Sequence, residues 1–402
     1  MRVLWISRNV PYDDVAHAGG KIHNFLLKFF QKKCSNCYLI SFAKEEEVSK
    51  IDLDKYGIPY DISKISLKKN LPYFGKKVLG LAFVFTYFLG MDTFWYIWRI
   101  YRSVLKYKGS RRNPDVVILQ WTSVVNQIWW LKSLFPTSKF VAIEEDVSFL
   151  KKERILKKSP LLIKFLKAPF FEVFKMKELH SLKMSDFVVL NNEKDQKLII
   201  KEGVDAGKTF VCHPFYQKMQ HIENKHIGKD VLFYGAMNRP ENYQSAIWFL
   251  ENVFVPKLEE QGFRFIVVGN KPNESLKKHH NGSSIQIIGF VDDVSPYFEK
   301  SLCLVAPLVM GAGVKIKVIE AMCTGLPVLT NEIGIEGIPA KDCVEYFFCT
   351  TPDDYGKRIA DLVKNVNLGY DIGEKAKELI KNNFNFEKDA DALYSKICSL
   401  AE

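Results

Sequence analysis

Short apolar runs alternate with longer stretches of helical periodicity from one end of the chain to the other. Apolar runs of this length, bounded by glycines and polar residues, predict strands that are buried in a sheet. They lie at 3–7, 38–41, 116–119, 140–143, 187–190, 231–234, 264–268, 284–288, 302–306 and 327–330. Helical stretches separate most of them, notably at 22–31, 126–134, 150–185 and 245–258. Strands that alternate with helices predict an α/β architecture with parallel sheets.

This rhythm restarts after a polar stretch at 212–229, which has the composition of a linker. We therefore predict two doubly wound domains that face a central cleft, at 1–212 and 213–385. A last helix at 386–402 is predicted to pack back on the first domain. Several strands of the second half end in a glycine, and such turns place backbone amides at the carboxyl edge of a parallel sheet, where ligands bind.

The composition is that of a folded protein. Of 402 residues, 47% are hydrophobic and 26% are charged, and the length suits two or three domains. The eight cysteines are scattered, and only Cys34 and Cys37 are closely spaced. No histidine or cysteine pair follows at the spacing of a metal site. We therefore expect reduced thiols in a cytoplasmic protein and no bound metal.

The positive charge is concentrated in the first half. Residues 1–210 hold 36 lysines and arginines against 21 aspartates and glutamates, whereas the rest of the chain has a small acidic excess. This asymmetry favours an anionic partner for the first half, such as lipid headgroups or a phosphate-bearing acceptor. Nucleic acid is disfavoured because no recognised nucleic-acid-binding module appears in the sequence.

One apolar segment, at 78–91, resembles a membrane contact. It is shorter than the roughly 20 residues that a spanning helix needs. Aromatic residues follow at 94–98, and basic residues flank both sides, which suits a helix that lies at the interface of an anionic membrane. The alternative is a buried helix pair of the first domain, so the sequence leaves open whether 78–98 contacts a membrane. The chain starts with a short apolar strand and not with the pattern of a signal peptide, which favours a cytoplasmic protein that is peripheral on the inner membrane face.

A glycine-bearing loop at 307–322 opens directly onto a helix. Its chemically informative residues are Gly311, Gly313, Lys315, Lys317 and Glu320. Free amides and the positive end of the helix dipole attract phosphate, and a lysine adds a point charge. A glutamate further along the helix offers hydrogen-bond acceptors to sugar hydroxyls, so the loop suggests a nucleotide-sugar site. The alternative is an ordinary helix start with a surface ion pair between Lys317 and Glu320.

Further stretches of the second half accompany this loop in a fixed order, at 235–242, 289–293, 320–322, 325–328 and 334–337. In this order and spacing they resemble the donor domain of retaining family 4 glycosyltransferases of the GT-B fold. The first half matches more weakly, through Gly19 and Gly20. The resemblance implies two Rossmann-like domains that face a central cleft, the first binding the acceptor and the second the nucleotide sugar.

The same resemblance implies roles for individual residues. Glu320 matches the glutamate that binds the ribose hydroxyls. The amides around 312–314 (Ala312, Gly313 and Val314) would contact the sugar or the diphosphate, and Phe290 and Val291 would line the base pocket. Gly235 lies in the donor domain's first turn, and Gly19 and Gly20 match a loop that approaches the donor phosphate and the acceptor. Such enzymes use a UDP- or GDP-linked sugar as substrate, with no cofactor and no metal, and stabilise the leaving diphosphate by charge.

The sequence departs from the family in the donor domain. Ala312 occupies the place of a glutamate that contacts the donor sugar, Ala236 that of an arginine, and Glu241 that of a lysine. We expect Lys315, Lys317 or Arg239 to supply the missing charge, with Lys315 as the first choice because Lys317 would lie near Glu320 on the helix.

A third departure is in the first domain, where many relatives have a histidine after the strand at 140–143. Here Glu145 occupies that approximate position, within an acidic triplet that ends at Asp146. Either residue is a candidate general base or a group that orients the donor sugar. The alternative is that these acids cap the following helix. His17, beside the glycine pair, is a further candidate for the acceptor and phosphate loop.

The sequence thus predicts an enzyme that transfers a sugar from a nucleotide donor to a glycan or lipid-linked acceptor at the cytoplasmic membrane face. A basic, aromatic-rich first domain suggests the lipid-linked acceptor. The competing hypothesis is a catalytically weak relative that acts as a binding or scaffold subunit, which the residues at 236, 241 and 312 motivate.

Overall fold

The structure, a computed structural model, describes residues 1–402 except 14, 16–17, 35, 66–93, 158–159, 214–218, 220, 226–227 and 312. Three predictions therefore concern residues outside the described set: His17, Ala312 and the part of segment 78–98 that precedes residue 94. The chain divides into two compact units. Unit 1 comprises Met1–Cys212 with Glu387–Glu402, and unit 2 comprises His213–Phe386.

Unit 1 is built on a parallel sheet. Its described strands are β1 (Val3–Ser7), β2 (Cys37–Lys44), β3 (Tyr60–Ile65), β4 (Val116–Gln120), β5 (Lys139–Glu144), β6 (Phe187–Leu190) and β7 (Thr209–Val211). They lie in the order β3-β2-β1-β4-β5-β6-β7, and each recorded pairing is parallel. The order reverses between β1 and β4, which is the doubly wound arrangement and places a ligand-binding switch point at their carboxyl ends.

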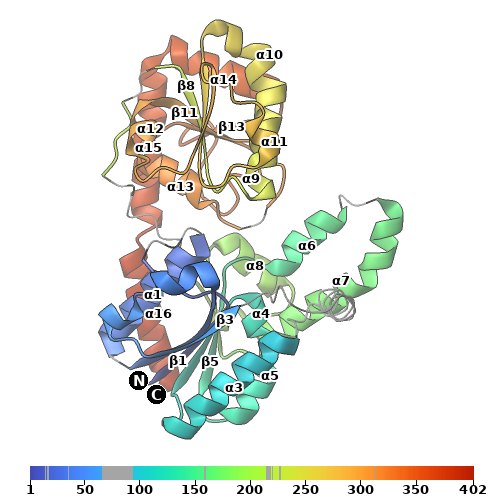
Figure 1. Cartoon of the computed structure of the whole chain (residues 1–402), viewed down its shortest axis with the longest axis vertical. Coiled ribbons are helices and arrows are strands. Elements are labelled where there is room, and N and C mark those ends of the chain that lie inside the picture. The colour runs from blue at the N-terminus through green and yellow to red at the C-terminus, as the bar shows by residue number, and fades with distance from the viewer. Residues whose placement is uncertain are drawn as a thin grey trace. The chain divides into compact units, whose positions relative to one another are not determined.

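Helices cover both faces of this sheet (Figure 1). They are α1 (Ala18–Cys34), α3 (Phe94–Ser110), α4 (Thr122–Val125), α5 (Ile128–Leu134), α6 (Ser148–Lys157), α7 (Leu161–Met184), α8 (Glu193–Lys201) and α16 (Phe386–Ala401). Short 3₁₀ turns lie at Glu45–Lys50, Leu53–Tyr56 and Ala206–Lys208. On one face, α3, α5 and α7 bury apolar side chains such as Ile100, Leu131 and Leu182 against the strands.

The last helix of the chain, α16, belongs to unit 1 and lies along α1 (Figure 1). Leu393 and Ile397 of α16 are fully buried. The ring of Tyr394 packs edge-on against Phe30 with centroids 5.3 Å apart. Unit 1 is therefore made from two separate stretches of sequence.

Unit 2 repeats the arrangement on a second parallel sheet. Its described strands are β8 (Asp230–Tyr234), β9 (Arg264–Val268), β10 (Ile285–Gly289), β11 (Ser301–Ala306), β12 (Val328–Thr330) and β13 (Phe347–Phe348), in the order β10-β9-β8-β11-β12-β13. All recorded pairings are parallel. The prediction of two α/β units with parallel, doubly wound sheets is confirmed, while the predicted cleft concerns their relative placement and stays a prediction.

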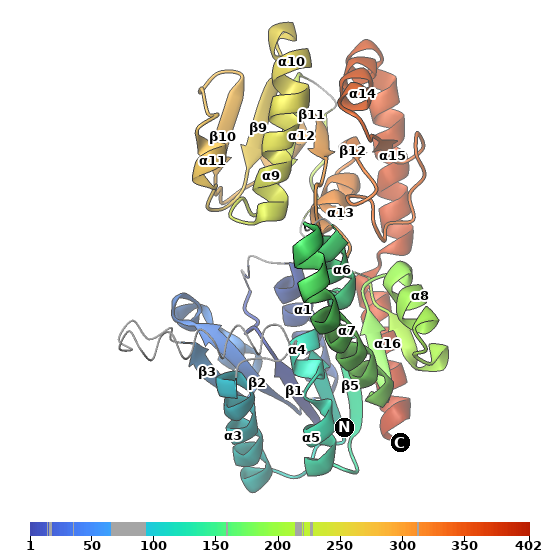
Figure 2. The same ribbon diagram turned by 90° about the vertical axis from the view of Figure 1, so that its right-hand side faces the viewer.

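Helices also cover both faces of the second sheet, as Figures 1 and 2 show. They are α9 (Pro240–Phe249), α10 (Val255–Lys257), α11 (Glu274–Lys277), α12 (Ser295–Lys300), α13 (Ile316–Cys323), α14 (Pro352–Lys364) and α15 (Val366–Asn383). A π-helical turn at Leu250–Phe254 joins α9 to α10, and a 3₁₀ turn lies at Glu259–Gln261. One apolar core lies under α9, α11 and α14, and a second lies under α12, α13 and α15.

The start of α9 corrects one prediction. The sequence predicts this helix from residue 245, whereas the structure begins it at Pro240. Pro240 occupies the first turn, where proline's fixed φ suits a helix and its missing N–H costs no hydrogen bond. The earlier start brings Glu241 and Asn242 onto the helix, beside the predicted donor site.

Candidate donor site and acidic cluster

The loop that precedes α13 turns sharply at two glycines. Gly311 has a φ of 133° and Gly313 a φ of 74°. These conformations favour glycine, because the Cβ atom of any other residue would clash with the backbone there. Lys315 takes the extended N-cap position, and α13 begins at the next residue. The loop therefore delivers two lysines to the first turn of a helix whose amide dipoles attract anions.

Lys315 is engaged within its own loop. Its Nζ donates a hydrogen bond to the carbonyl oxygen of Gly313 and lies 3.8 Å from Oε2 of Glu336. The Glu336 side chain is buried, so this carboxylate already balances much of the Lys315 charge.

Lys317 has a different environment. Its Nζ donates a 2.7 Å hydrogen bond to Oδ1 of Asn242 and lies 4.9 Å from the centroid of the Phe233 ring. Burial of the ammonium, reinforced by the positive charges of Lys315 and Arg239 and opposed by the negative charge of Glu241, lowers the pKa of Lys317 to about 7. The alternative of a surface ion pair with Glu320 is therefore corrected, because the contacts of the Lys317 ammonium are to a neutral amide and an aromatic ring.

Glu320 is buried on the second turn of α13, with 6% of its surface exposed. Its negative charge, together with burial, raises the pKa of Tyr234 at the end of β8. A buried carboxylate close to the carboxyl edge of the sheet is suitably placed to accept hydrogen bonds from hydroxyl groups of a ligand.

The turns after β8, β9 and β10 meet at the same edge of the sheet. The amide of Gly235 donates to the carbonyl of Val268, and that of Gly269 donates to Gly289. A Cβ atom on Gly269 would lie 1.6 Å from the carbonyl oxygen of Gly235. The two turns can approach this closely only because residue 269 is a glycine.

The remaining predicted donor residues lie around this edge. Arg239 precedes α9 and pairs with Glu241 at 2.6 Å, with about half of its side chain exposed. Phe290 follows β10 and is 68% exposed, whereas Val291 and Val314 are partly buried against the core under α13. An exposed aromatic ring can stack on the flat ring system of a ligand.

In unit 1, Glu145 lies where the carboxyl ends of β4, β5 and β6 meet. Its carboxylate accepts hydrogen bonds from Nε2 of Gln120 at 2.6 Å and Nδ2 of Asn191 at 3.2 Å. A Cβ atom on Gly19 would lie 3.1 Å from its Oε2, so the glycine loop directly adjoins the acid. The structure thus brings Glu145 and Gly19 together, with Gly20 as the next residue of α1.

Loss of hydration raises the pKa of Glu145 to about 7. The hydrogen bonds from Gln120 and Asn191 oppose this shift, and the negative charge of Asp146 adds to it. A carboxylate with a pKa near neutrality exchanges protons readily at the pH of the cell, which suits a general base.

The alternative prediction for the acids at 144–146 is that they cap the following helix. At the start of α6, the amides of Ser148 and Phe149 instead donate to the two carboxylate oxygens of Glu178, at 2.8 and 3.0 Å. Glu144 accepts from the hydroxyl of Thr122. These recorded bonds assign the capping of α6 to Glu178 of α7.

Sequence reasoning missed several residues of both clusters. Gln120 and Asn191 each follow a predicted strand by one residue, so polar residues at strand ends were a usable signal. Asn242 and Tyr234 had a similar signal, since one follows the first glycine turn of unit 2 and the other ends its first strand. Glu178 lies far along the chain from its partners and gave none, whereas Glu336 lies in the stretch at 334–337 that resembles the family but was not predicted to pair with Lys315.

In comparison with known proteins, the family match lies in unit 2. Residues 228–365 match the family model described as glycosyl transferases group 1. The chain is 26% identical over 195 residues to an uncharacterized 44.6 kDa protein in the cps region of Klebsiella pneumoniae. It is 24% identical over 224 residues to an uncharacterized glycosyltransferase of Methanocaldococcus jannaschii. These matches cover 46% and 51% of this chain, and 49% and 63% of the relatives.

The likeness to solved structures extends over both units. The crystal structure of Anabaena HepE in complex with UDP superimposes with a TM-score of 0.66 at 13% identity, covering 99% of this chain and 100% of that one. At such an identity the likeness shows the fold, while the family match rests on unit 2. Residues 228–365 thus match the group 1 glycosyl transferases, and the chain as a whole has the GT-B fold.

Proposed function

We propose that this protein is a glycosyltransferase that takes a sugar from a nucleoside-diphosphate donor held by unit 2. The observation that carries the proposal is the environment of Lys317: a cation at the start of α13 whose contacts are a neutral amide and an aromatic ring. The lowered pKa supports this, because the ammonium gains too little from its surroundings, the charge of Glu241 included, to offset the loss of water. A diphosphate would supply the missing negative charge. A UDP complex of the structurally similar HepE is in keeping with such a donor.

The other groups of the edge complete a plausible donor site. In this proposal the buried Glu320 accepts hydrogen bonds from the ribose hydroxyls, and the exposed Phe290 stacks on the base. Lys317 takes precedence over Lys315 as the phosphate ligand, since Lys315 is already balanced by Glu336. In this arrangement Lys317 of α13 takes the place of the positive charges that the family has at positions 236 and 241.

Unit 1 supplies the acidic cluster. We place Glu145 as the group that receives a proton from the acceptor hydroxyl or orients the transferred sugar, because it adjoins Gly19 and has a pKa near 7. The acceptor is proposed to be a lipid-linked or cell-surface glycan intermediate, reached from the cytoplasmic face by a peripheral protein. Retention of anomeric configuration and independence of metal remain part of the proposal.

The test is nucleotide release from a panel of UDP- and GDP-linked sugars, with and without membrane extract as acceptor source. We expect one donor to stand out and EDTA to leave the rate unchanged. Glu320→Ala should lower the rate by about 100-fold through loss of hydrogen bonds to the donor, whereas the matched Glu332→Ala, at an exposed position after β12, should not.

Binding without release for every donor, in all conditions, would favour the alternative of a scaffold subunit. The departures from the family at positions 236, 241 and 312 are the reason to test that alternative. A rate that EDTA abolishes would overturn the proposed metal independence alone.

Glu145 predicts a pH dependence. A base must be ionised to accept a proton, so the rate of transfer should rise with pH through about 7 and then level off. Glu145→Gln should lower the rate by about 100-fold or more and flatten the profile. Asp146→Asn should keep most of the rate and move the midpoint to lower pH, because the charge of Asp146 raises the pKa of Glu145. A profile that both variants leave unchanged would remove Glu145 from the mechanism.

A further inference from the structure

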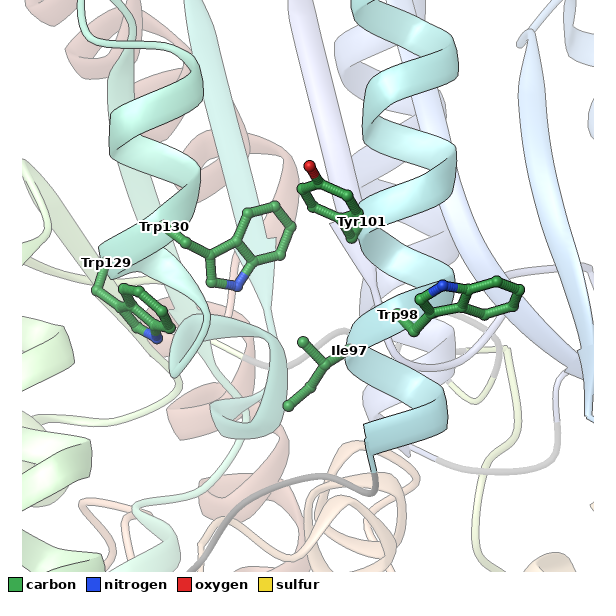
Figure 3. Close-up of a pocket in the computed structure, with 5 residues that line it drawn as sticks. All are labelled: Ile97, Trp98, Tyr101, Trp129 and Trp130. Carbon is green, nitrogen blue, oxygen red and sulfur yellow. The ribbon is translucent and has the colours of Figure 1, made fainter.

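A hollow lies between α3 and α5 on the surface of unit 1. Its volume is about 360 Å³, and its lining consists of apolar and aromatic side chains (Figure 3). The lining residues are Ile97, Trp98, Tyr101, Trp129 and Trp130. In the figure, the rings from the two helices stand on either side of the hollow, and Tyr101 lies edge-on to Trp130 with centroids 5.8 Å apart.

These aromatic side chains face solvent to an unusual degree. Trp98 is 41% exposed, Tyr101 44% and Trp129 62%, and Leu105 adds another exposed apolar side chain at 41%. Trp98, Tyr101 and Leu105 are spaced by three and four residues, so they form one stripe along α3. An apolar stripe that remains in contact with water on a folded unit indicates a surface that is covered in use.

The charged residues of the two helices themselves have one sign, although Lys106 pairs with Asp61 of β3 and Lys132 pairs with Asp186, each at 3.3 Å. Neither α3 nor α5 contains an aspartate or a glutamate, and together they carry five basic residues: Arg99, Arg102, Lys106, Lys108 and Lys132. The guanidinium of Arg102 lies 4.9 Å from the Trp98 ring centroid. At about 100° per residue, Arg102 and Lys106 border one side of the stripe and Lys108 borders the other. Aromatic rings are thus framed by cations.

We infer that this α3–α5 surface docks unit 1 onto an anionic lipid bilayer. Tryptophan and tyrosine are the residues that settle at the boundary between headgroups and hydrocarbon, and lysine and arginine beside them attract anionic headgroups. A carbohydrate ligand fits less well, because the hollow offers aromatic and aliphatic surface but few polar groups to pair with sugar hydroxyls. The excess of basic residues on α3 and α5 favours an anionic bilayer over an uncharged apolar protein surface.

The inference names the surface through which the proposed peripheral enzyme would reach a lipid-linked acceptor, but it does not depend on sugar transfer. Among the described residues, none of the helices is both long and apolar enough to cross a membrane. The α3–α5 surface differs from the exposed apolar positions on α7, such as Leu161 and Phe165, which lack comparable tryptophans.

The experiment is co-sedimentation of the full chain with phosphatidylcholine vesicles, with or without 30% phosphatidylglycerol. We expect binding to the anionic vesicles that is at least tenfold tighter than to the neutral ones and that weakens as salt rises. Trp98→Ser with Trp129→Ser should weaken binding at least tenfold. Arg102→Gln with Lys106→Gln should weaken it by about 25-fold, since each basic residue at an anionic surface contributes about fivefold.

Matched pairs on unit 2 serve as controls. Val366→Ser with Tyr370→Ser removes apolar side chains of similar exposure, and Lys278→Gln with Lys357→Gln removes two exposed charges. Both pairs should bind vesicles like the wild type. Unchanged circular dichroism and unchanged donor hydrolysis should show that the α3–α5 variants are folded and keep the donor site.

Three results would overturn the inference. The first is equal binding to neutral and anionic vesicles. The second is binding that survives both α3–α5 variants but is lost in Leu161→Ser with Phe165→Ser, which would move the surface to α7. The third is concentration-dependent self-association that the Trp98→Ser and Trp129→Ser pair abolishes, with no vesicle binding, which would assign the surface to a second copy of the chain. Absence of donor hydrolysis by the wild type would instead count against the proposed function.

Discussion

The buried ammonium of Lys317 destabilises the fold but favours the binding of an anion. A lysine pKa lowered to about 7 means that the folded protein holds this proton less tightly than the unfolded chain does. The free energy of unfolding should therefore rise with pH from about 7 toward the pKa of an exposed lysine, as the proton leaves the folded state first. An anion that binds beside Nζ would reverse the shift and draw a proton in.

We therefore predict that Lys317→Met weakens UDP or GDP binding by about 10- to 100-fold while leaving the melting temperature unchanged or higher. Wild-type affinity should fall between pH 7 and 8.5, because the free protein must then take up a proton to bind, and the variant should show no such fall. Titration calorimetry in buffers of different ionisation enthalpy measures both quantities.

Lys315→Met is the matched comparison. Its Nζ already lies near Glu336, so its removal should cost less nucleotide affinity than that of Lys317. A larger loss in Lys315→Met would restore the first choice made from the sequence. That choice rested on helical spacing, which places Lys317 near Glu320 but carries no information on Asn242, 75 residues away in sequence.

At the scale of elements, the turns after β8 and β9 limit which substitutions unit 2 tolerates. Gly269 has a φ of 153°, and its Cβ position is filled by the carbonyl of Gly235. We predict that Gly269→Ala lowers the free energy of unfolding of unit 2 by about 3 kcal/mol or more, as backbone must move. Gly262→Ala should cost only about 1 kcal/mol, because Gly262 also has a positive φ but open space around it. Urea unfolding of both variants checks this, and equal costs would contradict the steric argument.

The strands that sequence reasoning found and those that it missed differ in their place in the sheets. Interior strands such as β1, β4 and β11 are buried throughout and appear as unbroken apolar runs. The missed strands β3, β7 and β13 all lie at sheet edges. They are short or only partly buried, so they lack the apolar run on which the prediction depended.

At the scale of the whole molecule, the uneven charge and the domain order were readable from the sequence alone. The basic excess in residues 1–210 falls within unit 1, where α3 and α5 contribute five basic and no acidic residues. The sequence pointed to this region through the run at 78–98, but could not show that Trp129 joins Trp98 around one hollow. Side chains that meet through tertiary packing leave no periodic signal.

The place of α16 has a consequence for the order in which the protein matures. The strands and helices of 1–212 leave the ribosome before unit 2, but the surface of unit 1 that α16 buries, including the ring of Phe30 on α1, stays uncovered until residues 387–402 are made. Unit 2 is a continuous stretch and has all of its parts before then. During synthesis, therefore, unit 2 is complete before unit 1, and unit 1 must pass that interval with apolar side chains exposed.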